Sequence, residues 1–556
     1  MTRVALFWSS TLIMLTSTMP HFSQAQQQPD AGHTSQELNN QIVTPKSSSV
    51  PSFTTPATPQ NIESGGAIVQ IESIELNGNS VFNDQALLAI LDIEGKEYDF
   101  AGLQNLARKI TDFYHQQDYP FARAILPAQT LTEGKLKIEI IEGRYGKISV
   151  SSDDTSVEYQ ESAQEYLSVL NSGSVIKGSE LENICLILDD QPGFSVIPVV
   201  KPGEKIGLGD LVVNIRPDKP YGGSVKLDNK GNRYTGSGRI QLDGYLNSPF
   251  IFGDKLDTSL VYTEENMWFG SLSYGLPLLY PGLRGNIGIQ HTDYQLGKEF
   301  TSLDAHGTAD ILSAGLKYPL VRSQQQNISL FTTYQQKWLV DKQGATATKA
   351  EKSSHVITTA LNFDFKDLIG GGGVTYGSIT WTHGFLDLDD GLYAIDNLTA
   401  HTDGVFDKIN FDVRRINNLP IKFHSLYVRI TGQKAFENLD SSEDFGLGGP
   451  NGVRAYPVGE SYGDEGILSQ IELRRVYNTR VSSYLFFDYG YTRTNHTPWT
   501  TLDNDRTIGG AGLGFQYTFK NIEMDTTVAW RTVGGPPQSD SRITTPTFWL
   551  NMSYNF

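Results

Sequence analysis

The sequence predicts a transmembrane β-barrel of 16 antiparallel strands that follows two small α/β domains. Residues 219–556 alternate between polar and apolar positions in segments of about ten residues, which Gly, Asn, Asp and Pro separate. Residues 68–144 and 145–218 each follow the order strand, helix, helix, strand, strand. Beyond residue 25 no apolar run approaches the ~20 residues that a membrane-spanning helix requires. A helical membrane protein is therefore excluded.

The net charge and the cysteine count exclude some kinds of partner and site. The 556 residues include 62 acidic and 44 basic ones, which gives a net charge of −18. Because phosphate binding needs a basic surface, we expect no nucleic acid partner. The single cysteine, Cys185, excludes a disulfide framework and a zinc cluster of thiolates, and we expect it to be a small buried residue.

The residue pattern of the N-terminal segment indicates that the protein is exported. Arg3 precedes an apolar stretch at 4–15, and Ser23 and Ala25 supply the small residues of a cleavage site. We therefore expect a signal peptide over residues 1–25. Residues 26–67 are rich in Gln, Ser, Thr and Pro and predict a disordered linker. A weak helical stretch at 35–43 makes this linker a candidate for a plug helix.

Two copies of one small α/β domain follow. In residues 68–144 we expect a strand at 68–76, a helix that Asn83 or Asp84 caps, a helix at 99–115, and strands at 122–128 and 135–141. The second helix has one apolar face, formed by Leu103, Leu106, Ile110 and Phe113. In residues 145–218 the elements recur at 146–151, 157–170, 178–188, 194–201 and 210–216. This order resembles a POTRA domain. An extended chain can add to a sheet edge of such a domain, and a spacer without a ligand is the alternative.

The strands of the predicted barrel have lipid on one face and water on the other. In 405–416, Ile409, Phe411 and Val413 alternate with Asn410, Asp412 and Arg414. Loop lengths agree, because the connections on the side of the α/β domains are short and those on the other side are long. A soluble β-sandwich or propeller is the alternative. The predicted strands are 222–230, 236–246, 255–264, 266–276, 283–293, 308–318, 324–338, 352–366, 373–385, 405–416, 422–433, 465–477, 480–493, 506–519, 522–533 and 545–556.

One long outer loop carries the candidate site. Loop 434–464 contains the glycine-rich run GLGGPNGVRAY at 446–456, and so many glycines allow close packing of the backbone. The run FFDYG at 486–490 places Asp488 among the residues that face the lumen. Arginine is the best bidentate partner of a carboxylate. We therefore expect the loop to fold inward so that Arg454 meets Asp488.

The same residues carry a resemblance to a known family. Val453, Arg454 and Tyr456 look like the Val-Arg-Gly-Tyr motif in the sixth loop of POTRA-barrel transporters, although Ala455 replaces the glycine. Phe486, Asp488 and Gly490 look like the matching motif of the barrel wall. The runs LDNKG (227–231), YTG (234–236), YGLP (274–277), YPG (280–282) and LDAHG (303–307) are similar to segments of the TpsB transporters of two-partner secretion. The resemblance covers residues 68–556.

The resemblance implies a function. An exoprotein with an N-terminal secretion domain would be recognised by two periplasmic POTRA domains and would cross the bacterial outer membrane through the barrel. Tyr554 and the terminal Phe556 resemble the signal that the barrel-insertion machinery reads, and outer-membrane lipid would surround the strands. Arg454 and Asp488 would hold the loop, either as a switch or as a static tether. The first alternative is an outer-membrane insertase, and the second is a passive porin.

No enzymatic site is expected. The chain has no serine elbow, no paired catalytic carboxylates and no nucleotide-binding loop, so we expect neither a cofactor nor a resident metal. Asp387, Asp389 and Asp390 lack the spacing of a calcium loop. Four histidines stand singly without the spacing of metal ligands, namely His291, His306, His383 and His424.

Overall fold

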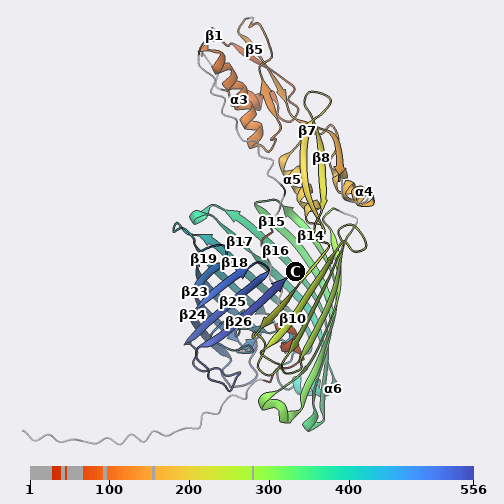
Figure 1. Cartoon of the computed structure of the whole chain (residues 1–556), viewed down its shortest axis with the longest axis vertical. Coiled ribbons are helices and arrows are strands. Elements are labelled where there is room, and N and C mark those ends of the chain that lie inside the picture. Colours follow the sequence, from red (N-terminus) through yellow and green to blue (C-terminus); the bar gives the residue numbers. More distant parts are fainter. Residues whose placement is uncertain are drawn as a thin grey trace, which may run out of the picture.

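The computed structural model describes residues 28–38, 44–46, 50, 65, 67–91, 97–131, 133–152, 157–278 and 281–556. The predicted signal peptide, 1–25, lies outside the described residues. Two α/β domains stand end to end at one end of the molecule, and a barrel forms the other end (Figure 1). None of the helices within the described ranges has the length and apolar character needed to cross a membrane.

The first α/β domain is a three-stranded sheet covered by two helices. It contains β2 (Ser73–Asn77), α2 (Asp84–Ala89), α3 (Phe100–Gln116), β4 (Arg123–Ile125) and β5 (Lys135–Ile141), with β5 between β2 and β4. Asn83 caps α2 and Asp99 caps α3 through their side chains. Leu103, Leu106 and Ile110 point into the core, as the helical spacing predicts, whereas Phe113 is only partly buried.

Two strand predictions in this domain are too long. The segment at 68–76 is divided into β1 (Val69–Gln70), which pairs with β3 (Glu97–Tyr98), and β2. The strand is interrupted there because Ile71 is buried and the amide of Glu72 donates to the carbonyl oxygen of Gly134. The strand expected at 122–128 is reduced to β4, since Ala122 still belongs to a turn in which its amide donates to Tyr119.

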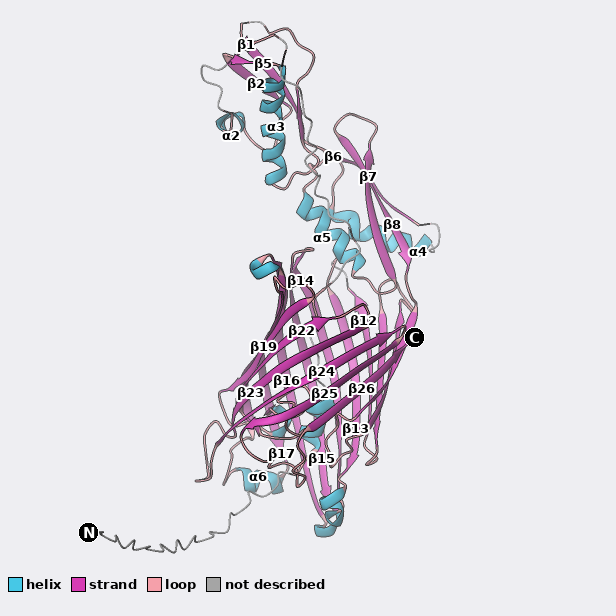
Figure 2. Ribbon diagram, turned by 60° about the vertical axis from the view of Figure 1, so that its left-hand side comes forward, coloured by secondary structure: helices cyan, strands magenta, loops and turns pink. Residues whose placement is uncertain are grey.

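The second α/β domain repeats the topology of the first. It contains β6 (Arg144–Ser151), α4 (Val157–Tyr166), the 3₁₀ turn η1 (Leu167–Val169), α5 (Gly178–Asp189), β7 (Phe194–Pro202) and β8 (Leu208–Pro217). In both domains the last strand is central, parallel to the first and antiparallel to the second (Figure 2). Cys185 lies in the core, where burial raises the pKa of its thiol to about 12.

A buried carboxylate joins the two domains. Glu142 accepts hydrogen bonds from the amide of Val81 (2.8 Å), the hydroxyl of Tyr114 (3.0 Å) and the guanidinium of Arg144 (3.0 Å). Burial raises the pKa of Glu142, but hydrogen bonds from Ser80, Val81 and Tyr114 outweigh it and leave the pKa below its ordinary value. Asp118 of the first domain accepts from the amide of Ser179 at the start of α5 (3.0 Å). The domains are thus held in one orientation.

Sixteen antiparallel strands form a closed barrel within the described part of the chain. In contrast to the prediction, Pro319 lies inside a strand, at a register shift where a residue without an amide hydrogen is tolerated. Several strands also extend further into the outer loops than predicted. The strands are β9 (Tyr221–Asp228), β10 (Arg239–Asn247), β11 (Lys255–Thr263), β12 (Trp268–Pro277), β13 (Arg284–Gln295), β14 (Ala305–Arg322), β15 (Gln326–Gln343), β16 (Thr348–Asp367), β17 (Gly373–Leu388), β18 (Gly404–Asn418), β19 (His424–Ala435), β22 (Glu465–Val476), β23 (Val481–Arg493), β24 (Asp505–Phe519), β25 (Ile522–Val533) and β26 (Thr547–Asn555).

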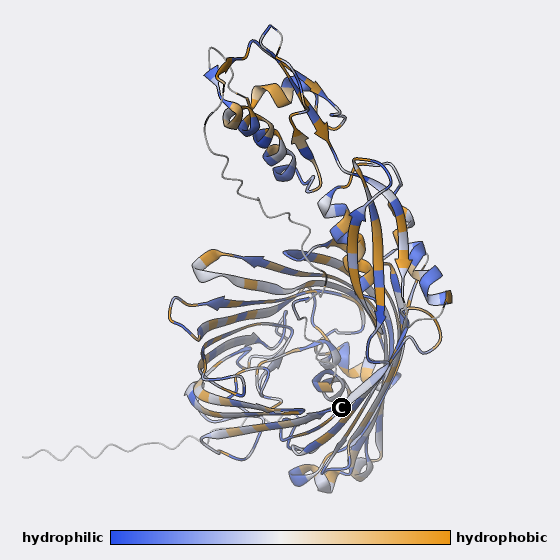
Figure 3. Cartoon of the chain, turned by 45° about the horizontal axis from the view of Figure 1, so that its top comes forward, coloured by the Kyte–Doolittle hydropathy of each residue, from blue (hydrophilic) through white to orange (hydrophobic). Residues whose placement is uncertain are grey.

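The two faces of each strand differ as the alternation predicts. On β23 the outward Leu485 and Phe487 are 61% and 44% exposed, whereas the inward Phe486 and Asp488 are 5% and 0% exposed. The hydropathy colouring shows apolar and polar residues mixed along the strands (Figure 3). Outward apolar residues match lipid, and the charged residues opposite them line the lumen.

Two segments occupy the lumen. The first is α1 (Ala31–Leu38), which contacts β14, β15 and η5 (Ser441–Glu443). It starts before the predicted stretch at 35–43, because Asp30 accepts a hydrogen bond from the amide of His33 at its N-terminus, and 39–43 lie outside the described residues. The second is residues 436–464, here named the inward loop, which contains η5 and the short hairpin of β20 (Phe445–Gly446) and β21 (Tyr462–Gly463).

The remaining short elements lie at the rims. At the end away from the α/β domains, η2 (Lys298–Leu303), η3 (Gly344–Thr346) and α6 (Asp390–Asp396) cap the outer loops (Figure 2). At the near end, η4 (Ile369–Gly371) forms the turn between β16 and β17. Asp389 caps α6 by accepting hydrogen bonds from two of its amides.

Candidate functional site in the barrel lumen

The inward loop is fixed to the barrel wall by one arginine. Arg454 donates from Nε (2.9 Å) and Nη2 (2.7 Å) to the two carboxylate oxygens of Asp488, and its own backbone amide donates to the same carboxylate (3.0 Å). Arg454 is 6% exposed and Asp488 is 0% exposed. A fully desolvated charge is stable only when it is paired in this way. The structure thus brings together the two residues that the loop motif and the wall motif supply.

A second carboxylate completes the surroundings of this guanidinium. Nη1 of Arg454 donates to Glu472 on β22 (2.6 Å), whose other oxygen accepts from Arg474 (2.7 Å). The guanidinium also lies over the ring of Phe486, 3.6 Å from its centroid. Sequence reasoning missed Glu472 as a partner, because the alternation along one strand does not reveal the register with its neighbours.

Glycines of the wall make room for the loop. A Cβ atom at Gly490 would lie 2.6 Å from a methyl carbon of Leu447, and one at Gly510 would lie 2.5 Å from the Cβ of Ala455. Both distances are too short for ordinary side chains. The alanine that replaces the motif's usual glycine therefore fits because the wall has a glycine opposite it. Val453 and Tyr456 are fully buried in the cluster around this contact.

The loop also contacts the last strands of the barrel. The hydroxyl of Tyr456 donates to the carbonyl oxygens of Val533 (2.6 Å) and Gly535 (2.8 Å). The indole of Trp549 on β26 donates to the carbonyl of Arg454 (2.8 Å), and Thr547 donates to that of Ala455 (2.9 Å). Sequence reasoning missed Trp549, although its position on the inward face of the last strand was a usable signal.

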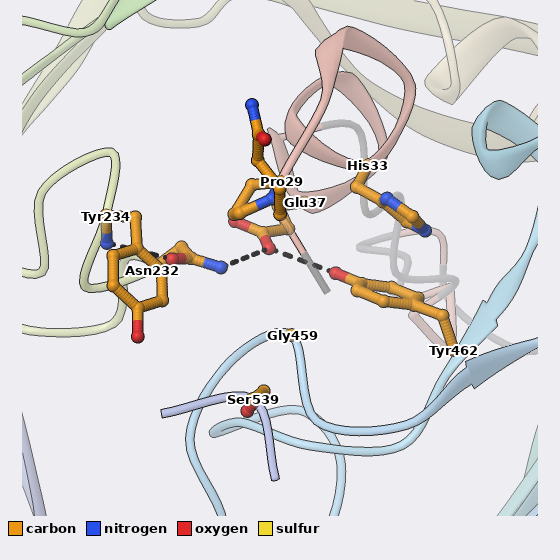
Figure 4. Close-up of a pocket in the computed structure, with 9 residues that line it drawn as sticks. Pro29, His33, Glu37, Asn232, Tyr234, Gly459, Tyr462 and Ser539 are labelled. Atoms are coloured by element: carbon orange, nitrogen blue, oxygen red, sulfur yellow. Dashed lines mark hydrogen bonds between the residues drawn. The ribbon is translucent and has the colours of Figure 1, made fainter. Parts of the chain in front are cut away.

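Helix α1 lies against the other side of the inward loop. The carboxylate of Glu37 accepts from the hydroxyl of Tyr462 (3.0 Å) and from the amide of Asn232 (3.4 Å), and the His33 ring packs on the Tyr462 ring at 4.0 Å between centroids (Figure 4). His33 also contacts Asp30 and Asp444. Burial lowers the pKa of His33, but Asp30 and Asp444 outweigh it and raise this pKa to about 10. His33 is therefore a buried cation at neutral pH.

The predicted insertion signal lies at the seam of the barrel. Tyr554 is 47% exposed on the outward face of β26, and Phe556 is 56% exposed just beyond it. The amide of Phe556 donates to the carbonyl of Gly223 on β9 (3.0 Å), so the chain end takes part in closing the barrel. The structure leaves both rings accessible on the lipid side.

Within the described residues, the histidines do not form a metal site. Across the described ranges, no group of three or more His, Cys, Asp or Glu side chains could hold a metal ion. His291 and His383 are not single, as the sequence suggests, because they pair with Asp310 (2.6 Å) and Asp407 (3.1 Å) of the neighbouring strands. Cross-strand pairing of this kind depends on register, which the sequence pattern does not give.

Comparison with known proteins decides the family. The family model of the haemolysin secretion/activation protein ShlB/FhaC/HecB matches residues 207–517, which is more than half of the chain. The chain belongs to this family. The ShlB-type POTRA domain matches residues 69–143 of the first α/β domain. The topology of the second α/β domain is the same, so both are described as POTRA domains below.

Relatives agree over the whole length. The chain is 26% identical to the heme/hemopexin transporter protein HuxB of Haemophilus influenzae (strain 86-028NP) over 551 residues, which cover 95% of each protein. The structure of CdiB from Escherichia coli is similar over 91% of this chain and 94% of that one, with a TM-score of 0.72 and 19% identity. The structure of CdiB from Acinetobacter baumannii is similar over 95% of this chain and 99% of that one, with a TM-score of 0.64 and 16% identity.

Family membership establishes the function of the chain. It is a TpsB transporter of two-partner secretion in the outer membrane, with POTRA domains in the periplasm, and it exports an exoprotein. The insertase and the porin are not favoured by these findings. The end of the barrel that carries α6 therefore faces the cell exterior.

Proposed function

We propose that an unfolded exoprotein binds the first POTRA domain and crosses the barrel after α1 has left the lumen. The observation that carries this proposal is that α1 and the inward loop lie inside the lumen and are held there by side-chain contacts. A polypeptide cannot pass while both are in place. Because α1 is held mainly by polar contacts at one end of the linker, it is the segment that can leave without unfolding the barrel.

One sheet edge is open for capture. Along the outer side of β2, none of the described residues makes a backbone hydrogen bond to Ile74, Glu75 or Leu76. An extended segment of the exoprotein's secretion domain can therefore add to β2 through backbone hydrogen bonds. Side chains at alternate positions would then select the sequence.

The other edges are protected. The amide of Ala124 on β4 donates to the hydroxyl of Thr111 (2.9 Å), and on β6 the amide of Val150 donates to the side chain of Gln164 (2.9 Å). Strand β7 contains Pro198 and Pro202, which lack an amide hydrogen. These features leave β2 as the best edge for an added strand.

The inward loop has a supporting role in this scheme. The Arg454 and Asp488 pair would keep the loop in one defined position while α1 moves, and Val453, Tyr456, Phe486 and Gly490 shape the contact. We further propose that the chain itself catalyses no reaction and needs no cofactor, since folding of the exoprotein outside the cell gives export its direction. Lipid would contact the outward strand faces, and the barrel-insertion machinery would read Tyr554 and Phe556.

Disulfide trapping during export tests the capture step. Cys185 is buried with a raised thiol pKa, so a new cysteine on the surface is the reactive one. Ser73→Cys or Asn77→Cys on β2 is co-expressed with the exoprotein encoded beside the transporter, which carries single cysteines through its secretion domain. We expect mixed disulfides at every second exoprotein position, because side chains alternate along an added strand.

The control lies on the protected edge of the second domain. Lys201→Cys on β7 is exposed like Ser73, and we expect it to form few mixed disulfides. Equal trapping at β7 and β2, or export without any trapping at β2, would contradict capture on this edge.

A further inference from the structure

One side of the lumen wall carries a group of cations, although the protein as a whole has a net charge of −18. A cavity of about 600 Å³ lies beside the inward loop, and its lining includes more basic than acidic side chains. Six cations on the inward faces of neighbouring strands form what is here named the basic wall: Lys337, Lys352, Lys408, Arg414, Arg429 and Arg474.

The arginines of the basic wall have too few carboxylates. Arg414 and Arg429 both pair with Asp412, at 2.8 and 2.7 Å. Arg474 shares Glu472 with Arg454, at 2.7 and 2.6 Å. Each of these carboxylates is therefore shared between two cations.

The lysines of the basic wall take their carboxylates from the segments inside the lumen. Lys337 (2.5 Å) and Lys408 (2.8 Å) both pair with Glu443 of the inward loop. Lys352 pairs with Asp440 of the same loop (2.7 Å) and with Asp30 just before α1 (3.4 Å). All three lysines are nearly buried. Among the described residues, none of the carboxylates within 4 Å of these lysines belongs to the barrel wall, although Asp341 of β15 also interacts electrostatically with Lys352.

This distribution determines what displacement would expose. The backbone of η5, which carries Asp440 and Glu443 at its ends, rests on α1 at Gly32, where a Cβ atom would lie 2.7 Å from the amide of Ser442. When α1 leaves, η5 loses this support. Lys337 and Lys408 then lose Glu443 as η5 shifts, and Lys352 loses Asp30 and Asp440 and keeps only Asp341 of β15 nearby. A cation that loses its paired carboxylate is unfavourable in such a partly desolvated position.

We propose that the basic wall binds acidic segments of the exoprotein during export, so that their carboxylates take the places of Asp30, Asp440 and Glu443. The lumen is thus selective for an anionic chain rather than a neutral conduit. Low-dielectric walls around a strip of one charge concentrate the opposite charge there. This inference rests on the proposed function, because α1 and η5 must first move.

Channel recordings test the inference. The full chain and a variant that lacks residues 28–38 are reconstituted in planar bilayers, and the reversal potential is measured in a KCl gradient. Poly-glutamate or poly-lysine is then added on the periplasmic side. In the shortened variant we expect higher conductance, preference for chloride, and block by poly-glutamate but not by poly-lysine.

Variants of the wall identify the residues. In the shortened chain, K337Q/K408Q should weaken poly-glutamate block by about fivefold for each charge removed. K337R/K408R keeps the charges and should retain the block, which separates charge from loss of packing. The control is Lys434→Gln, because Lys434 is exposed near the outer rim and pairs with Glu465.

The outcomes are distinct. If removal of residues 28–38 leaves the conductance unchanged, the proposed role of α1 is wrong. The ion selectivity of K337Q/K408Q, compared with that of the unsubstituted wall, then still decides the role of the basic wall. Equal block by both peptides, or block of K337Q/K408Q equal to that of the unsubstituted wall, would overturn the inference.

Discussion

At the scale of single residues, the lumen site depends on the fit of one guanidinium. Arg454 satisfies Asp488 and Glu472 together and packs on Phe486, so it carries out three contacts that no other side chain can make at once. The resulting pair is buried. It adds little net stability to the fold, but removing one partner is costly in free energy. Removing one partner of such a pair costs about 3–5 kcal/mol, because the other charge stays buried.

We expect Arg454→Gln to damage the loop more than the double variant Arg454→Gln with Asp488→Asn. The single change leaves a buried carboxylate without its cation, whereas the double change leaves two neutral amides. Limited proteolysis of the inward loop and thermal unfolding of the barrel in detergent would measure this. Arg415→Gln is the control, since its pair with Asp367 lies at the periplasmic rim. Additive effects of the two single changes would count against a coupled pair.

The contact of Ala455 with Gly510 gives a second prediction at this scale. Gly510→Ala should expel the loop, because the new Cβ atom would lie 2.5 Å from that of Ala455. Ala455→Gly in the same chain should restore the fit by moving the glycine from the wall to the loop. Export and loop proteolysis are the measurements. If the swapped double variant behaves like Gly510→Ala alone, the contact does not explain why alanine is accepted in the motif.

At the scale of elements, the sequence predicts what depends on local periodicity. Strands such as β23 were predictable because Leu485 and Phe487 alternate with Phe486 and Asp488, and lipid and lumen impose that period. Helix α1 was predicted only weakly and with the wrong start. Its stability comes from contacts with Tyr462, Asn232 and η5, which lie far away in the sequence, and from the packing of Ala31 and Leu38 against apolar residues of the barrel.

The same principle explains what was missed at the site. The loop motif and the wall motif identify Arg454 and Asp488, because each motif is local. Glu472 and Trp549 become partners only through the register of neighbouring strands and the path of the loop across the lumen. A pattern along one strand tells which face a side chain takes, but not which side chain lies opposite.

Docking of α1 should weaken as pH rises. Docking raises the pKa of His33 from an ordinary 6.5 to about 10, so the docked state binds the proton more tightly. The equilibrium constant for docking is then largest at pH values below the ordinary pKa of His33. It falls about tenfold per pH unit until the pH reaches the pKa of the docked state, and it is constant above that pH. The charged or titratable groups around His33 are Asp30, Glu37, Lys352, Asp440, Asp444 and Tyr462.

Conductance of the reconstituted full chain measures this dependence. We expect the conductance to increase as the pH rises from the ordinary pKa of His33, 6.5, to its docked pKa of about 10. His33→Gln should remove this increase. His424→Gln is the control, since His424 lies at a periplasmic turn. A conductance that rises equally in His33→Gln would assign the pH dependence to another group.

At the scale of the whole molecule, the POTRA domains form an arm whose base is fixed to the barrel. Phe252, in the turn between β10 and β11, is 5% exposed and enters the core of the second POTRA domain, where it stacks on Phe194 at 4.7 Å. Arg284 of β13 donates to Gln191 (2.7 Å), and Asp190 at the end of α5 pairs with Arg322 of β14 (2.9 Å). If the exoprotein binds at β2 as proposed, this arm would hold it at a set distance from the mouth of the barrel.

Phe252→Ala should free this arm. Truncation of a buried aromatic side chain costs about 3–5 kcal/mol, and here most of the lost contacts join the domain to the barrel. Distances between spin labels at Glu161→Cys on α4 and Lys520→Cys at the periplasmic rim should form a narrow distribution in the parent and a broad one in Phe252→Ala. Export should fall in parallel, because the captured segment would no longer be held near the mouth.

The same turn supplies the control. Phe250 is 70% exposed and lies two residues from Phe252, so Phe250→Ala should keep the narrow distribution and normal export. Cys185 reports whether the domain stays folded, because it reacts with thiol reagents only when the core opens. A narrow distribution in Phe252→Ala with unreactive Cys185 would show that Arg284 and Arg322 suffice to fix the arm. A broad distribution with normal export would show instead that the transporter does not need a fixed distance between capture and passage.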